Sequence, residues 1–200
     1  KRRLRWIAFA AVPSSLLSSL TAYLTTDLAS GPLLWVVPLV LYLLSFILIY
    51  RDRPLITPAQ SSRVLPLALM AVAFTSSVRA AGPLIVLLVA GLTVTFLAAT
   101  LAHGLLYEDR PSPKHLTEFY LLASVGGALG GAFNALVAPL IFSDLHELAV
   151  GLLALCALRA YATPPQDESS LARDLAHGFA ALGLGLLGLA PRRFLPEAIA

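Results

Sequence analysis

The chain has 200 residues, of which 58% are hydrophobic and 12% charged, and its mean hydropathy is +0.82. A soluble domain is about 45–50% apolar and about 25% charged, so this composition excludes soluble globular, disordered, collagen-like and disulfide-stapled proteins. The net charge of +3 comes from 14 Lys and Arg against 11 Asp and Glu. Because the cations lie mostly in short polar segments and at the N-terminus, they indicate membrane topology and no nucleic-acid-binding surface.

Seven apolar segments follow one another along the chain. A membrane-spanning helix needs about 20 mainly apolar residues, and a helix pairs every backbone amide within its own segment. Since apolar residues run continuously and do not alternate, a membrane β-barrel is excluded. We predict an all-α, multi-pass transmembrane bundle of six to seven helices surrounded by the lipid bilayer. The segments are 6–26, 28–50, 64–78, 84–102, 116–142, 148–162 and 176–190.

The distribution of cations predicts the orientation of the bundle. If the segments alternate across the membrane, most Lys and Arg fall on the side of the N-terminus, which is therefore cytoplasmic by the positive-inside rule. The polar stretch 164–170 separates a predicted bundle, 1–162, from a second part, 163–200. That second part holds a linker and the weak, glycine-rich segment 176–190, which either crosses the membrane or lies at its periphery.

The fifth segment carries two glycine pairs at i,i+4, Gly126/Gly130 and Gly127/Gly131, followed by Asn134. Small residues at this spacing allow two helix backbones to approach closely, and an amide can hydrogen-bond across such a contact. We predict that these four glycines pack against another helix. The same stripe also fits a helix that lines a ligand path, and the two interpretations are compatible.

Four residues are the predicted ligand-binding set: Asp27, Trp35, Ser124 and Asn134. Asp27 is the only acid between Trp6 and Tyr50, and it either caps the next helix or attracts a cation. Ser14, Ser18, Thr21 and Thr25 fall within one narrow arc of the first segment. Hydroxyls on one face of a helix indicate a surface turned inward, for packing or for a solute.

A second group of polar residues surrounds the end of the fourth segment. His115 and Glu118 have i,i+3 spacing, which suits two ligands of one metal on a helix, but metal sites usually need three or four ligands. An enzyme built on His103, His115 and Glu118 is therefore an alternative, while the main prediction is a charged cluster at the membrane interface. The chain has no recognisable catalytic motif and a lone cysteine, Cys156, so we predict no catalysis, no metal and no cofactor.

Two stretches resemble a known family. The first comprises residues 13–15, 23–29 and 32–46, and the second comprises His103-Gly104 with residues 116–120 and 126–142. Together they resemble the membrane half of bacterial fused transporter-like/spermidine-synthase-like proteins, over roughly residues 2–160. The resemblance implies a helical bundle in the bacterial inner membrane. In that family a soluble aminopropyltransferase-like domain follows the membrane region, and the strand–helix alternation of such a domain does not occur in this chain.

These observations predict a multi-pass bacterial inner-membrane protein, transporter-like in character, that handles a small cationic solute such as a polyamine. The solute path would follow the face that bears Asp27, Trp35, Ser124 and Asn134. The alternative is a non-catalytic accessory subunit of a larger membrane complex, or a homo-oligomer, that docks on a partner chain through the glycine-rich helix 116–142.

Overall fold

The computed structural model describes residues 1–25, 33, 35–51, 53–77, 84–142, 150–151, 153–155 and 157–158. Within these ranges the chain forms helices and no strand, which confirms the predicted all-α class. The elements are α1 (Arg2–Tyr23), α2 (Val36–Ile49), α3 (Pro58–Ser77), α4 (Leu84–Glu108), a 3₁₀ turn (Pro113–His115), α5 (Leu116–Ala132), a π-helical turn (Phe133–Val137) and α6 (Ala138–Ile141).

Three helical stretches of the described chain are long and apolar enough to cross a membrane: Arg2–Tyr23, Leu88–Glu108 and Pro113–Ile141. The α2 helix is apolar but shorter, at 14 residues. Only 17% of the apolar stretch in Pro113–Ile141 is buried, against 56% for Leu88–Glu108. An apolar surface that the protein itself leaves uncovered is what a lipid environment requires.

The helices differ from the predicted segments mainly at their ends. The α3 helix begins at Pro58, six residues before the predicted segment 64–78. Its start is a capping box, because the backbone N–H of Thr57 donates to Gln60 Oε1 at 2.9 Å and that of Gln60 donates to Thr57 Oγ1 at 3.3 Å. Residues of segment 148–162 that the structure describes are helical, and segment 176–190 lies outside the described residues.

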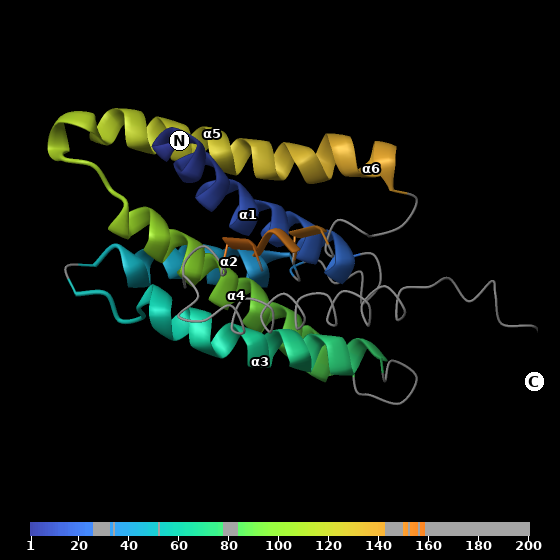
Figure 1. The fold of residues 1–200 in the computed structure, drawn as a ribbon. Coiled ribbons are helices and arrows are strands. Elements are labelled where there is room, and N and C mark those ends of the chain that lie inside the picture. Colours follow the sequence, from blue (N-terminus) through green and yellow to red (C-terminus); the bar gives the residue numbers. More distant parts are fainter. Residues whose placement is uncertain are drawn as a thin grey trace, which may run out of the picture.

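The α4 helix lies at the centre of the described bundle. It packs against α1, α2 and α3, while α5 packs on the far side of α1. Figure 1 shows α5 and α6 as one continuous rod with α1 beside it. The main core joins α1, α3, α4 and α5 and includes Trp6, Leu16, Leu65, Leu101 and Phe119.

A π-helical turn links α5 to α6 because of Pro139. A proline inside a helix lacks the N–H for the i→i−4 bond, and its ring collides with the carbonyl of residue i−4. The wider turn over Phe133–Val137 lies directly before Pro139 and accommodates both effects. This turn contains Asn134.

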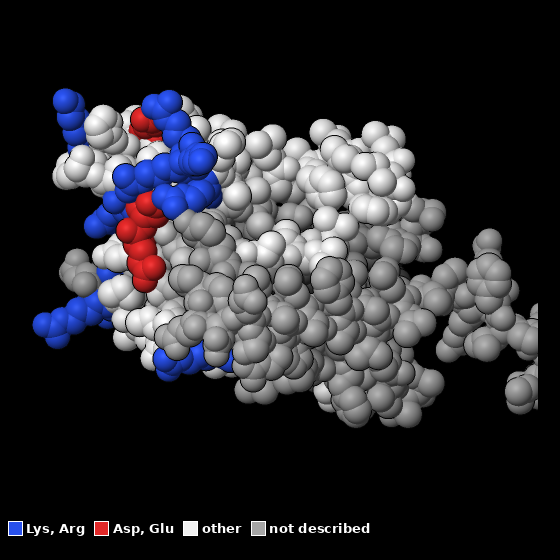
Figure 2. Space-filling model, viewed as in Figure 1, with Lys and Arg blue, Asp and Glu red and all other residues white. Residues whose placement is uncertain are grey.

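The charged residues of the described chain gather at one end of the bundle. The N-terminus and the α2–α3 and α4–α5 connections lie at this end in Figure 1, and Figure 2 shows the Lys, Arg, Asp and Glu side chains of the visible face there. The opposite end of that visible face shows no charged side chain among the described residues. The described cations are Lys1, Arg2, Arg3, Arg5, Arg51, Arg53, Arg63, Arg110 and Lys114.

Candidate functional site

The α5 helix contacts α1 through Gly126 and Gly130. A Cβ atom added at Gly126 would collide with the backbone oxygen of Ile7, and one added at Gly130 would collide with that of Ala11. These two glycines therefore permit an approach of two backbones that any side chain would prevent. We call this contact the α1–α5 interface. At this interface, α1 covers the Gly126/Gly130 side of α5.

The other predicted glycine pair has different surroundings. No atom lies within 4 Å of a Cβ built at Gly127. A Cβ at Gly131 would have only the hydroxyl oxygens of Ser14 and Ser18 near it, each at 4.0 Å. The tight contact thus involves one pair of glycines, and the other pair faces open or ordinary van der Waals space.

Asn134 lies at the α1–α5 interface and its amide is used there. Its Nδ2 donates to the hydroxyl of Ser15 at 2.7 Å and to the carbonyl oxygens of Ser15 and Gly130, at 3.2 and 3.0 Å. The hydroxyl of Ser19 donates to Asn134 Oδ1 at 2.7 Å. The predicted ligand residue therefore links α5 to α1, in the way that amides join helices in membranes.

The hydroxyl arc on α1 is mostly satisfied within its own helix. Ser18, Thr21 and Thr25 donate to carbonyl oxygens three or four residues earlier, at 2.7 to 3.1 Å. Ser14 differs, because its hydroxyl donates to the carbonyl oxygen of Gly127 on α5 at 2.8 Å. Of this arc, Ser14 alone links two described helices through its hydroxyl, and the geometry favours packing.

The predicted ligand-binding set does not form one surface. Asp27 lies outside the described residues. Trp35 precedes α2 and is 47% exposed, while Asn134 is held at the α1–α5 interface. Only Ser124 lines a cavity of the described bundle.

That cavity has a volume of about 480 Å³ and lies among α1, α2, α4 and α5. Such a volume is in the usual range of about 300–1,000 Å³ for small-molecule pockets. Helices α2 and α5 both pack against α1 but do not pack extensively against each other, which leaves this space between them. We call it the aromatic cavity. Its lining residues are Ala10, Tyr42, Phe46, Ile47, Tyr50, Leu106, Tyr120, Ala123, Ser124 and Gly127.

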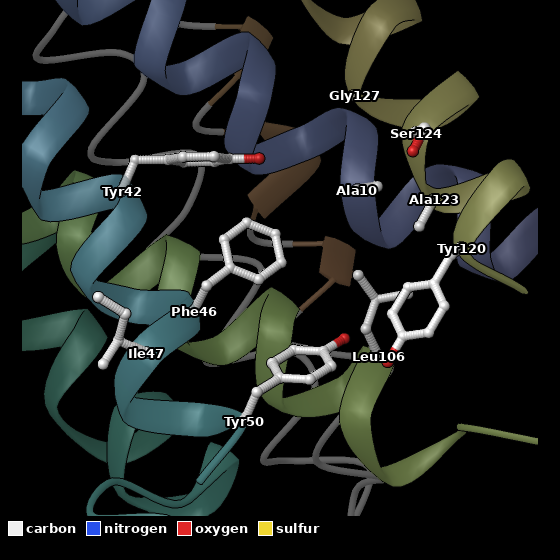
Figure 3. Close-up of a pocket in the computed structure, with 10 residues that line it drawn as sticks. All are labelled: Ala10, Tyr42, Phe46, Ile47, Tyr50, Leu106, Tyr120, Ala123, Ser124 and Gly127. Carbon is white, nitrogen blue, oxygen red and sulfur yellow. The ribbon is translucent and has the colours of Figure 1, made fainter. Parts of the chain in front are cut away.

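Aromatic rings form two walls of this cavity. Tyr42, Phe46 and Tyr50 follow one another along α2, with ring centroids 5.5 and 5.7 Å apart. Tyr120 stands across from them on α5, and Leu106 of α4 lies between the two walls (Figure 3). Among the described residues, no hydrogen bond engages the hydroxyls of Tyr50 and Tyr120, so these oxygens are available to an occupant.

His103 lies behind the α2 wall. It is fully buried, its ring stacks on Phe46 with centroids 3.6 Å apart, and its Nδ1 is 2.8 Å from the hydroxyl oxygen of Ser45. The other two members of the predicted enzymatic group lie elsewhere, since His115 is exposed and Glu118 pairs with Arg3. No group of three or more potential metal ligands occurs in the described part of the chain.

Two acids at the charged end of the bundle, Asp109 and Glu118, are engaged by cations. Asp109 accepts from Nε of Arg2 at 2.9 Å, from Nη2 of Arg5 at 3.2 Å and from the indole N–H of Trp6 at 2.9 Å. Glu118 is paired with Arg3. This network joins the start of α1 to the α4–α5 connection and to the start of α5.

The spacing of aromatic residues in the sequence indicates the α2 wall of the cavity, but the predicted ligand-binding set contains none of these aromatic residues. Tyr42, Phe46 and Tyr50 have i,i+4 spacing, which places their rings on one face of a helix. Tyr120 on another segment offers no such pattern. Its role depends on how α5 is placed relative to α2.

Comparison of the chain with protein-family models, with curated proteins and with solved structures finds no match.

Proposed function

We propose that this chain is a multi-pass protein of the bacterial inner membrane, with a cytoplasmic N-terminus, that binds a small cationic solute as a transporter-like, non-catalytic module. The observation that carries the proposal is the aromatic cavity among four helices. Its lining combines four aromatic residues with one serine and no charged residue. Sites of this kind bind organic ligands through apolar contact and a few polar groups.

Aromatic rings give such a cavity an affinity for cations. The face of an aromatic ring attracts an ammonium group by about 0.5–2 kcal/mol, and more strongly where water is removed. Three rings on α2 and one on α5 surround the same space. The two walls belong to helices without extensive mutual contact, so a change in their separation would alter access to the site.

The orientation rests on the charged end of the bundle. Nine described Lys and Arg belong to the N-terminus, the α2–α3 region or the α4–α5 connection, and cytoplasmic loops of membrane proteins are enriched in these residues. A reporter fused before Lys1 tests this, with a second reporter in the α4–α5 connection. Activity of a cytoplasm-specific reporter at both positions supports the orientation, and activity of a periplasm-specific reporter contradicts it.

An accessory subunit that docks through the glycine-rich helix is the less supported function. The Gly126/Gly130 side of α5 is already covered by α1. The outward apolar residues of α5, among them Leu121 and Leu129, are 62% and 54% exposed and suit contact with lipid. A docking partner would therefore have to use a lipid-facing surface.

Ligand binding by the purified chain in mild detergent tests the function. Choline, tetramethylammonium, putrescine and spermidine are each added, and the shift in thermal unfolding is measured, because a ligand that binds only the folded state stabilises it. We expect at least one cation to raise the unfolding temperature in proportion to the logarithm of its concentration.

Two neighbouring substitutions on α5 provide a matched control. Ser124→Trp places a large ring at a cavity-lining position, whereas Val125→Trp places the same ring at a 40% exposed position outside the lining. We expect the first to abolish the shift and the second to keep it. No shift with any of the four cations, or equal shifts in both variants, would contradict the proposed function.

A further inference from the structure

We propose that the aromatic cavity selects a compact organic cation with a single positive charge, such as an alkylated ammonium group, and discriminates against polyamines. This inference rests on the proposed function and names its substrate class. It replaces the polyamine suggested by the sequence with a ligand whose charge the described residues can balance.

The positive charge would be balanced by ring faces. The centroids of Tyr42 and Phe46 are 5.5 Å apart and those of Phe46 and Tyr50 are 5.7 Å apart, so the three rings form a continuous aromatic strip along α2. Tyr120 lies across the cavity from this strip (Figure 3). Surrounding a cation by several rings is the established way in which proteins recognise quaternary ammonium groups.

Further positive charges on the same ligand would find no counter-charge. No lining residue is acidic. Of the three described acids, Asp109 is engaged by Arg2, Arg5 and Trp6, Glu118 is engaged by Arg3, and Glu108 is exposed and does not line the cavity. An unpaired charge taken out of water is strongly unfavourable, so each additional ammonium of a polyamine weakens binding in this cavity.

The phenol hydroxyls add a polar contact for the rest of the ligand. Tyr50 and Tyr120 come from opposite walls, and both oxygens lie on the Leu106 side of the cavity (Figure 3). The other side-chain polar groups of the lining are the hydroxyls of Tyr42 and Ser124, and Ser124 lies beside Gly127, away from Leu106 (Figure 3). A ligand that carries a hydroxyl beside its ammonium group, as choline does, matches this arrangement.

Isothermal titration of the full chain in mild detergent tests the inference with three probes. Choline is compared with 3,3-dimethylbutan-1-ol, which has the same shape without the charge, and with spermidine. We expect choline to bind at least about tenfold more tightly than either, a ratio that corresponds to about 1.4 kcal/mol.

Variants of Tyr120 separate the ring from the hydroxyl. Tyr120 is 47% exposed, so its replacement leaves the core intact. Tyr120→Leu removes the ring and the hydroxyl and should weaken choline binding about fivefold, whereas Tyr120→Phe keeps the ring, loses the hydroxyl contact alone and should weaken binding only about twofold. If Tyr120 had only a structural role, Tyr120→Leu would lower the unfolding temperature, but choline and the uncharged 3,3-dimethylbutan-1-ol would keep the same relative affinities.

The outcomes are distinguishable. Spermidine binding as tightly as choline overturns the inference and leaves the proposed function standing. Equal binding of choline and the uncharged isostere overturns it in favour of an apolar occupant such as a lipid chain. Failure of every cation to bind overturns the proposed function together with the inference.

Discussion

Consecutive glycines on α5 meet opposite surroundings. Gly126 and Gly130 lie against the backbone of α1, where an added methyl group would strike the carbonyl oxygens of Ile7 and Ala11. Gly127, one residue further along, has no atom within 4 Å of its would-be Cβ and lines the aromatic cavity. A rotation of about 100° around the helix, one residue in a 3.6-residue turn, separates a packing surface from a candidate ligand site.

Composition alone therefore does not assign a role to a small-residue stripe. The α1–α5 interface adds hydrogen bonds of Asn134 and Ser14 to its close backbone contact. The cavity side is bordered by aromatic residues and lacks such bonds between α5 and α2 in the described chain. Substitutions on the first side should therefore affect stability, and substitutions on the second side should affect binding.

The largest loss of stability is expected from Gly130→Ala. The added methyl group must displace the backbone of α1, and overpacking of this kind costs about 1–3 kcal/mol. The matched control Gly131→Ala places the same methyl 4.0 Å from two hydroxyl oxygens and should be neutral or slightly stabilising. Unfolding in a denaturing detergent titration measures both, and equal effects would show that the two sides of α5 are not different.

A smaller loss is expected from Asn134→Leu. The substitution removes the hydrogen bonds to Ser15 and Ser19 across the interface, which in membranes are worth about 1 kcal/mol. Ser124→Ala, on the cavity side, should change the unfolding free energy by less than about 0.5 kcal/mol. If Ser124→Ala lowered the unfolding free energy as much as Asn134→Leu does, both sides of α5 would be packing surfaces.

Asp109→Asn tests how the start of α1 is held against α5 and α4. It removes ion pairs with Arg2 and Arg5, whose side chains are 51% and 39% exposed. Because exposed pairs are weak and screened by salt, we expect a loss of about 0.5–1 kcal/mol at low ionic strength that shrinks at high ionic strength. A loss that did not depend on salt would point to the Trp6 hydrogen bond instead.

The smallest difference is expected between two serines of α1. Ser14→Ala loses a bond to the Gly127 carbonyl on α5, for about 0.5 kcal/mol, whereas Ser18 donates to its own helix. Ser18→Ala should therefore be neutral. Thermal unfolding of the two variants side by side checks this, and a larger effect at Ser18 would contradict the assignment of Ser14 to the interface.

Much of the fold could be predicted from hydropathy. The continuous apolar runs predicted helices, and the described helices α1, α4 and the α5–α6 rod overlap the predicted segments. The early start of α3 was also encoded, because Thr57 and Gln60 form a capping box around Pro58, but that signal lies outside the apolar run. The late start of α2 at Val36 was also encoded, because Gly31-Pro32, a pair typical of turns, lies inside the predicted segment 28–50 just before it.

The site was less predictable because it depends on how helices are placed. The glycine spacing indicated a close contact, yet it could not tell which of two adjacent pairs would meet α1. Asn134 had the chemistry of a ligand residue, and only its distance to Ser15 shows that its amide is already used. The cavity itself arises from the separation of α2 and α5, which no local pattern specifies.

The direction in which a Gly127 side chain would point distinguishes a ligand site from a packing surface, although the Gly127 carbonyl itself accepts a hydrogen bond from Ser14 of α1. Gly127→Leu tests this distinction most directly, because Gly127 lines the cavity and a Cβ at this position has no atom within 4 Å. Measured together on one purified variant, its unfolding free energy should be unchanged or higher, because leucine favours a helix over glycine by up to about 1 kcal/mol, while its choline affinity should fall at least about tenfold. An unchanged affinity, or a loss of stability as large as that of Gly130→Ala, would contradict the account.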